Sequence, residues 1–489
     1  MAGLMAGLTL PSIMKHKWRW AFAFTAVVVG LSGVVAAKSA FGQFGPLGDL
    51  PTIDDAPEIH CAGMDLAYCM DTGDTAFMYT AASFVMIMTP GGVGFLYGGY
   101  TRRRNALTVI LQCFLVYAIV SVQWVFWGYS LMFGPDATGH GFIGSLEWAG
   151  LNNVLHDAPA DVYAPTIPHQ AFVMFQLMFA AITPALAIAG YADRVKMSAF
   201  MIHVVLWTTF VYDFVGHWNW SLGSQGTAGG WLGELGALDF AGGTVIHITS
   251  GFAGLASAMF LGRRLGYGRA PFEPHAIPLM ILGAILLWFG WFGFNPGSAG
   301  AVGGLSTSAF MVTNTATAVS AMWWMFLSWA HTGRASAVGA ASGAIAGLVA
   351  ITPASGFVGP MASVIIGFTS GTVCFYALVI KNRGRVDDAL DTWPVHGIGG
   401  VVGALLTGAF AEERIGGAAG AFFGNPMQFG INATGAAAAI AWAFGITLLI
   451  WKIQDLIWPG GVRVTPREEE IGLDLTQVGE KAYGQFTGE

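Results

Sequence analysis

Charged side chains are scarce in this 489-residue chain: they make up 10% of it, whereas hydrophobic residues make up 55%. Soluble domains carry about 25% charged residues, so a globule of this size would lack the charge that its surface needs. The composition therefore excludes a soluble enzyme and a disordered chain. A net charge of −7 also argues against a nucleic-acid partner, which needs a basic surface. We expect a membrane protein that crosses the lipid bilayer several times.

Cysteine is also scarce, and four cysteines are too few for a disulfide scaffold. Cys61 and Cys69 lie close together before the first long apolar run, where they can pair only if that segment faces an oxidising compartment. Cys113 and Cys374 lie within apolar runs. We expect these two to be small buried packing residues.

The N-terminus has the pattern of a secretory signal. Basic residues precede the apolar run 21–37, and small residues follow it, as in signal peptides. The alternative is a retained membrane helix, for which this run is short, because a span needs roughly 20 residues. We predict a signal peptide over residues 1–40 and an exported acidic segment over residues 41–73.

Apolar runs of spanning length recur after residue 73. The domain over residues 74–458 is predicted to contain eleven of them, and residues 459–489 form a C-terminal tail. The spans are placed near residues 74–98, 105–133, 168–191, 197–218, 238–262, 276–295, 306–330, 336–352, 360–380, 394–411 and 428–457. Gly and Ala dominate several runs, which favours close helix packing in lipid. The runs are too long for a β-barrel and lack its alternation, so the fold class is an all-α polytopic membrane protein.

Basic residues fall in alternate connections between these spans. They are Arg102 to Arg104, Arg194 and Lys196, Arg263, Arg264 and Arg269, Arg334, Lys381, Arg383 and Arg385, and, after the last span, Arg463, Arg467 and Lys481. The intervening connections have no Lys or Arg except Arg414, which is offset by two glutamates. The positive-inside rule then places the mature N-terminus outside and the C-terminal tail in the cytoplasm, across the inner (plasma) membrane of the cell.

Two histidines lie within predicted spans, where ionisable groups are costly and are functional candidates. His247 and His396 each share a helical stripe with small residues, which marks a helix-packing face. Those small residues are Gly243 and Gly251 for the first, and Gly400 and Gly403 for the second. The alternative is an ordinary hydrogen-bonded core histidine. If the two imidazoles meet, burial and mutual repulsion keep them neutral, which suits a small neutral polar cargo or single protons.

Two aspartates are the other intramembrane candidates. Asp239 begins the His247 span, where it is expected either to cap the helix or to stabilise a cation or receive a proton at the mouth of a pathway. Asp213 lies beside Tyr212, nearer the outer surface. We expect Asp213 to be mainly structural, with an electrostatic attraction for cations.

Several segments, in this order, resemble the ammonium transporter (Amt/Mep/Rh) family, and specifically its bacterial and archaeal Amt branch. They are PGGVGFLYGG (90–99), FQLMFAAITPAL (175–186), DFAGGTVIHITSGFAGLASAMFLGRR (239–264), WFGFNPGSAG (291–300), RVDDALD (385–391) and DTWPVHGIGG (391–400). The resemblance covers about residues 74–483. It implies a trimer of subunits, each with eleven helices in an inverted five-plus-five repeat plus one, and a pore in every subunit.

The resemblance also implies a role for each matching residue. Trp220, Phe179 and Ser298 would form an outer ammonium-recruitment site, and Phe179 and Phe294 a stacked pair that closes the pore mouth. Asp239 would support binding and deprotonation of NH4+. His247 and His396 would be the twin histidines past which NH3 is conducted. Whether the proton crosses separately stays open, so electrogenic transport and an ammonia channel are both allowed.

The implied partners are ammonium or ammonia, methylammonium, a homotrimer, the lipid bilayer and a PII-type regulatory protein at the cytoplasmic face. The tail 452–483 resembles the one on which such regulators act, although Val478 stands where many relatives have His. No enzymatic activity, cofactor or metal is expected. Two alternatives compete: an ammonium sensor that signals through its tail, and a redox protein with His247 and His396 as haem or copper ligands.

Overall fold

The structure is a computed structural model that describes residues 70–483, except residues 161, 225, 270–271 and 385. The predicted signal peptide, most of the exported segment, and both Cys61 and Cys69 lie outside the described residues. Cys113 and Cys374 are buried in helices, which confirms their packing role.

Helices account for nearly all of the regular structure. In chain order they are α4 (Thr72–Ile87), α5 (Gly94–Tyr100), α6 (Ala106–Gln123), α7 (Tyr129–Phe133), α8 (His169–Ala187), α9 (Met197–Trp207), α10 (Asp213–Trp220), α11 (Trp231–Glu234), α12 (Thr249–Leu261), α13 (Ile277–Gly297), α14 (Gly304–Thr332), α15 (Ala337–Ile351), α16 (Pro360–Gly384), α17 (Ile398–Phe410), α18 (Glu413–Gly416), α19 (Pro426–Ile457) and α20 (Pro466–Ile471). The strands β1 (Pro159–Ala160) and β2 (Ala164–Pro168) form a small antiparallel pair.

Several of these helices are halves of longer ones joined by a π-helical turn. Such turns connect α4 to α5, α6 to α7 and α9 to α10, and two more, Gly243–Ile248 and Trp393–Gly397, lead into α12 and α17. These last two turns contain the two candidate histidines. A π-helical turn inserts an extra residue into the helical ladder and is frequent at functional sites.

Nine helical segments within the described residues are long and apolar enough to cross a membrane, which confirms an all-α polytopic membrane fold. The two other predicted spans coincide with α14, which is 29 residues long, and with α15, an apolar helix of 15 residues. The eleven-span topology and its orientation stay predictions.

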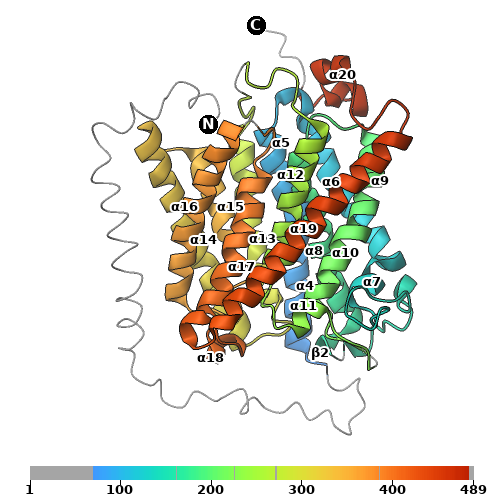
Figure 1. Cartoon of the computed structure of the whole chain (residues 1–489), viewed down its shortest axis with the longest axis vertical. Helices are drawn as coiled ribbons and strands as arrows, with labels where there is room; N and C mark the ends of the chain where they lie inside the picture. The colour runs from blue at the N-terminus through green and yellow to red at the C-terminus, as the bar shows by residue number, and fades with distance from the viewer. Residues whose placement is uncertain (1–69, 161, 225, 270–271, 385, 484–489) are drawn as a thin grey trace. The chain divides into compact units, whose positions relative to one another are not determined.

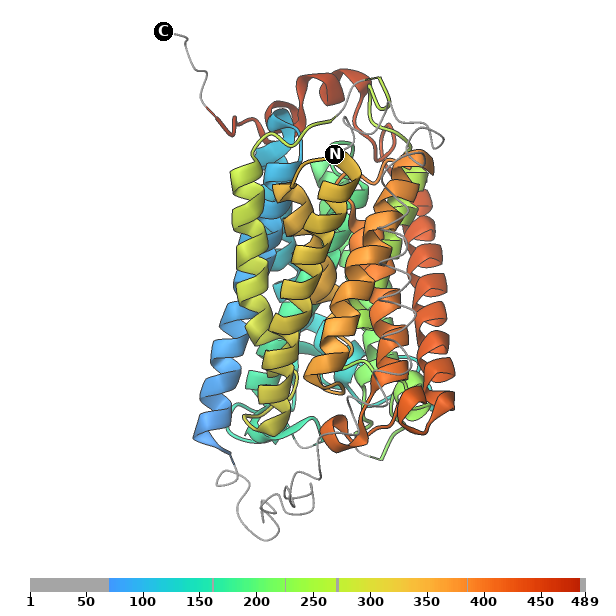
Figure 2. The ribbon, with the colours of Figure 1, turned by 90° about the vertical axis from the view of Figure 1, so that its left-hand side faces the viewer.

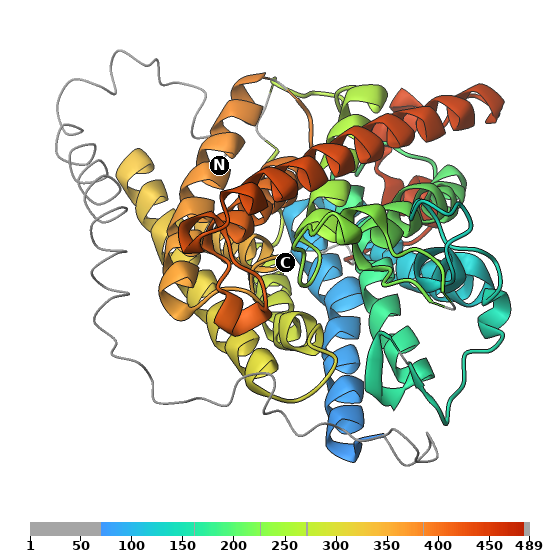
Figure 3. The ribbon, with the colours of Figure 1, turned by 60° about the horizontal axis from the view of Figure 1, so that its bottom comes forward.

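The long helices of residues 70–483 run side by side in one bundle (Figures 1 and 2). The last long helix, α19, crosses the others obliquely and packs against α12 and α17 (Figure 3). The short helices α11 and α18 lie at one end of the bundle, and α20 of the tail lies at the other (Figure 1).

Glycine lets the central helices approach closely, as the small-residue stripes predict. A Cβ atom on Gly251 would lie 2.1 Å from the backbone nitrogen of Gly397, and one on Gly190 would lie 2.0 Å from the carbonyl oxygen of Gly254. Because lipid gives helices no hydrophobic drive to associate, such contacts between backbones supply much of the packing. The contact at Gly251 fixes the distance between α12 and the turn that leads into α17, and so the spacing of the two histidines.

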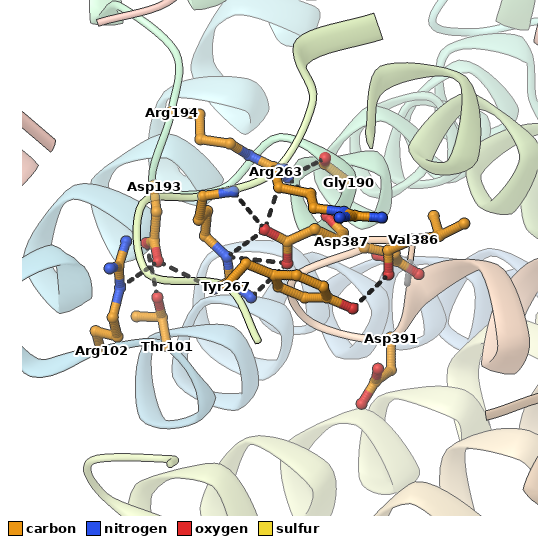
Figure 4. A network of polar contacts seen from close by, with 12 residues as sticks. Thr101, Arg102, Gly190, Asp193, Arg194, Arg263, Tyr267, Val386, Asp387 and Asp391 are labelled. Carbon is orange, nitrogen blue, oxygen red and sulfur yellow. Dashed lines mark hydrogen bonds and ion pairs between the residues drawn. The ribbon is translucent and has the colours of Figure 1, made fainter. Parts of the chain in front are cut away.

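The basic connections gather at the α20 end of the bundle, where they form a buried polar network (Figure 4). Asp193 accepts from the Nε of Arg102 at 3.0 Å and from the Nη1 of Arg264 at 3.2 Å. Asp387 binds Nη2 of Arg264 at 2.7 Å and lies 3.5 Å from Nη1 of Arg194. Connections far apart in the sequence thus lie together, as alternate loops at one membrane face must.

The tail is fastened to the same end. The Asp474 carboxylate accepts from the backbone nitrogens of Leu107 and Thr108 at 3.2 and 2.7 Å, so it caps the start of α6. Glu469 accepts from the backbone nitrogen of Leu265 at 2.6 Å and from Arg463 at 2.9 Å. The tail therefore packs on the same connections that the charge network joins.

Candidate functional site

The two candidate histidines meet in the middle of the bundle. Nδ1 of His247 lies 3.3 Å from Nδ1 of His396, and the side chains are 0% and 3% exposed. A proton shared between the two Nδ1 atoms leaves each Nε2 facing away from the pair. Nε2 of His247 is buried and has no hydrogen-bond partner among the described residues. The pair therefore offers a polar atom to a small molecule without carrying fixed charge.

Two aromatic rings pack against the His247 imidazole. The Trp291 ring stacks near the imidazole at a centroid distance of 5.5 Å and the Phe294 ring at 6.2 Å. The indole of Trp291 is held by a 2.9 Å hydrogen bond to Oγ1 of Thr352. These rings surround the histidine pair with apolar groups, which exclude bulk water and disfavour an ion.

Asp239 lies at the start of the turn that carries His247. Oδ1 accepts from the backbone nitrogens of Gly242 and Gly243 at 2.9 and 2.7 Å, and Oδ2 from those of Thr244 and Val245 at 2.8 and 3.0 Å. The expected helix cap is confirmed, and it is made possible by Gly242, whose φ of 114° favours glycine. The cap fixes a carboxylate, 8% exposed, eight residues before the histidine.

The predicted recruitment and gate residues cluster around Phe179. The Phe179 and Phe294 rings lie 4.5 Å apart at 89°, so they meet edge to face rather than stacked in parallel. Trp220 lies 6.1 Å from Phe179, and its Nε1 donates to the carbonyl oxygen of Asp239 at 2.8 Å. The hydroxyl of Ser298 donates to the carbonyl oxygen of Phe294 at 2.9 Å, which leaves its oxygen able to accept. The structure thus joins these residues to Asp239.

Asp213 is fully buried, and its hydrogen bond is to a residue outside the cluster around Phe179. Its Oδ2 accepts from Nε2 of Gln123 at 2.8 Å, and Oδ1 has no partner among the described residues. The link between α10 and the neighbouring α6 agrees with the structural role expected for it.

Several residues near His396 were not predicted as site residues. A cavity of about 30 Å³ is lined by His396, Tyr97, Tyr100 and Asp391, and Lys381 contacts Asp391. The aspartates of the motif RVDDALD entered only as part of the family resemblance, and no chemical role was predicted for them. The available signal was a spacing: Asp388 precedes His396 by the same eight residues that separate Asp239 from His247.

A helical bundle of membrane-spanning length that encloses two paired imidazoles beside aromatic rings defines a transport protein for a small polar species. The family model described as the Ammonium Transporter Family matches residues 76–483, and the chain belongs to this family.

Known proteins of the family resemble the chain over most of its length. It is 46% identical over 417 residues to an ammonium transporter of Bacillus subtilis, covering 85% of this chain and 99% of that one. It is 44% identical to Amt1 of Archaeoglobus fulgidus, covering 85% and 100%. The crystal structure of Mep2 from Saccharomyces cerevisiae matches with a TM-score of 0.79 and 38% identity, covering 87% of this chain and 94% of that one.

Proposed function

We propose that this protein recruits NH4+ at its outer aromatic cluster, deprotonates it near Asp239, and conducts NH3 past the twin histidines into the cytoplasm, with or without separate transfer of the released proton. The observation that carries the proposal is the histidine pair itself. Two imidazoles 3.3 Å apart, with a buried Nε2 that has no hydrogen-bond partner in the described part of the chain, favour a neutral species that can donate and accept hydrogen bonds. Relatives named ammonium transporters support the choice of cargo.

Recruitment rests on the rings of Trp220 and Phe179 and on the Ser298 oxygen. A weakly hydrated monovalent cation is attracted to aromatic faces, and a hydroxyl oxygen accepts one N–H. The backbone carbonyl of Asp239 is tied to Trp220, so the cation site and the carboxylate form one unit. Phe179 and Phe294 close the way inward, and their displacement would admit the cargo.

Deprotonation supplies the selectivity. NH4+ and K+ have similar sizes, so an oxygen cage would separate them poorly, whereas only NH4+ can give up a proton and continue as a neutral molecule. The Asp239 carboxylate stabilises the cation before this step. The neutral lane between His247 and His396 then accepts NH3 and rejects K+, because an ion there would be desolvated without a counter-charge.

The test is ammonium transport into proteoliposomes, measured as uptake and, where the proton crosses separately, as a current. Asp239→Ala should abolish it, because both the cation site and the helix cap are lost. His247→Ala and His396→Ala should alter the size and the ion selectivity of the current. Full ammonium uptake by the Asp239→Ala variant would overturn the mechanism.

The other assignments are proposals as well. We propose a homotrimer in the inner (plasma) membrane, with the C-terminal tail in the cytoplasm as a docking surface for a PII-type regulator. Size measurement in detergent and pull-down with a PII-type protein test the two. The sensor alternative predicts ammonium binding without flux, so measurable flux in the liposome assay excludes it as the sole function.

A further inference from the structure

The cavity at His396 is lined both by this histidine and by Asp391 of the loop that contains Asp387 of the charge network. Its lining also includes the rings of Tyr97 and Tyr100. At about 30 Å³ it has room for about one or two molecules of the size of water or ammonia. Asp391 belongs to the same loop as Asp387 of the network (Figure 4). A molecule that leaves the histidines toward this end therefore meets a carboxylate.

That carboxylate already holds an alkylammonium group. Oδ2 of Asp391 accepts from the hydroxyl of Tyr100 at 2.6 Å, and Oδ1 contacts Nζ of Lys381. Nζ also donates to the carbonyl oxygen of Asp388 at 2.9 Å. Lys381 is only 6% exposed, so its charge is held inside the protein by this cluster.

The cluster has more acceptor capacity than Lys381 uses. Asp388 is 1% exposed, and its Oδ2 accepts from the backbone nitrogen of Trp393 at 2.8 Å. Its Oδ1 is buried without a hydrogen-bond partner in the part of the chain that the structure describes. Asp239, by contrast, has both oxygens satisfied by backbone N–H groups. The carboxylates of this cluster can therefore accept hydrogen bonds from a further cation.

The head group of lysine belongs to the same chemical class as the proposed cargo. It is a primary ammonium with one positive charge and three N–H donors, and methylammonium has the identical head group. A site that binds the one in a given geometry can bind the other. We propose that Lys381 is a tethered competitor at a second, inner ammonium site, where its Nζ occupies the Asp391 carboxylate that a free ammonium ion would otherwise bind.

This inference rests on the proposed function, in which NH3 passes His396. In the cavity NH3 takes a proton from water, and the products are NH4+ and one hydroxide ion. The new cation would be retained by a free carboxylate that lines this cavity. Because Lys381 is always present at high local concentration, it displaces the cation from Asp391. The Lys381 head group thereby lowers the retention of NH4+ in the cavity, and it also lowers the entry of ammonium from the cytoplasm.

The experiment uses right-side-out membrane vesicles, which keep the orientation of the cell. They are preloaded with unlabelled methylammonium, and the initial uptake of labelled methylammonium is measured. The readout is the internal concentration that halves this rate. Lys381→Met should lower that concentration about ten-fold, since the freed carboxylate offers the internal cation a charged hydrogen bond.

Three further variants separate competition from a structural role. Lys381→Met combined with Asp391→Asn should restore the wild-type value, because the site itself is lost; Asn also tolerates the φ of 65° at position 391. Lys381→Arg should raise the value, because a guanidinium can bind both carboxylate oxygens. Lys452→Met, which removes an exposed lysine of α19, should change nothing.

A folded Lys381→Met variant with the wild-type value overturns the inference. If that variant does not reach the membrane, Lys381→Arg decides: a raised value supports the competitor and an unchanged one overturns it. Failure of the proposed function looks different. It would appear as absent methylammonium uptake by the wild type, or as undiminished uptake by Asp239→Asn, whatever the internal concentration.

Discussion

Trp220 makes two contacts of different chemistry, and substitutions can separate them. Its ring faces the proposed cation site beside Phe179, and its Nε1 donates to the carbonyl oxygen of Asp239. A cation–π contact and a hydrogen bond are each worth about 1 kcal/mol, so neither contact is expected to dominate.

Trp220→Phe should raise the ammonium concentration for half-maximal current about five-fold, since the ring stays and one hydrogen bond is lost. Trp220→Leu should raise it by about a further five-fold, because the aromatic face is lost too. The measurement is the current in proteoliposomes over a range of ammonium concentrations. Trp442→Phe loses a matched indole bond to the carbonyl oxygen of Phe210 and serves as the control. Equal effects of Phe and Leu at position 220 would remove the cation–π contact from the mechanism.

Single residues were the part of the site most accessible from sequence. His247, His396 and Asp239 stand out because an ionisable group in an apolar run needs an explanation. The inner cluster did not stand out, because Lys381 and Asp391 lie near basic residues that the orientation rule already explained. Their pairing depends on how a loop folds back on α16, which hydropathy does not encode.

Helix spacing at the centre depends on Gly251. The Cβ of an alanine there would meet the backbone of Gly397 at 2.1 to 2.3 Å. A Cβ atom is fixed by its own backbone and cannot rotate away from another backbone, so the helices themselves must move. The histidine pair is next to this contact, since His396 directly precedes Gly397.

Gly251→Ala should therefore lower the ammonium current and the melting temperature, with a cost of about 1–3 kcal/mol from overpacking. The matched control is Gly445→Ala on α19, where an added Cβ has nothing within 4 Å. Alanine favours a helix over glycine, so the control should be neutral or slightly stabilising. Thermal unfolding in detergent and liposome currents measure both variants. A Gly251→Ala variant with wild-type current would show that the histidine spacing tolerates helix displacement.

Helices were predictable as elements, and their interruptions were not. Apolar runs and glycine stripes predicted the bundle and the closely packed faces of α12 and α17. The π-helical turns at Gly243–Ile248 and Trp393–Gly397 have no hydropathy signal, because one extra residue in a turn leaves the composition unchanged. These turns nevertheless decide where the imidazoles point.

Over the whole molecule, the network at the α20 end ties distant connections together. Arg194 is buried and donates to the carbonyl oxygens of Gly262 and Asp387 at 2.6 and 3.0 Å. With Arg264 on Asp193 and Asp387, the cations and carboxylates are mutually compensated, as buried charges must be. The distribution of basic residues predicted which loops share a face, but it did not predict these pairings.

Asp387 gives this network a defined pH dependence. Burial raises the pKa of its carboxyl group, but the charges of Arg264 and Arg194 and the hydrogen bonds from Arg264 outweigh burial and lower the pKa to about 2. A depressed pKa means that the ionised form stabilises the folded protein. This contribution is complete above the unfolded pKa, near 4, and disappears as the pH falls toward 2; it amounts to about 2 kcal/mol. Asp387→Asn should lower the melting temperature at pH 7, because it removes the carboxylate that Arg194 and Arg264 share; breaking a buried pair costs about 3–5 kcal/mol. The variant should also lose less stability than the wild type between pH 4 and pH 2. Melting temperatures in detergent across this range test both statements, and parallel acid profiles for the two proteins would show that Asp387 is not the group that titrates.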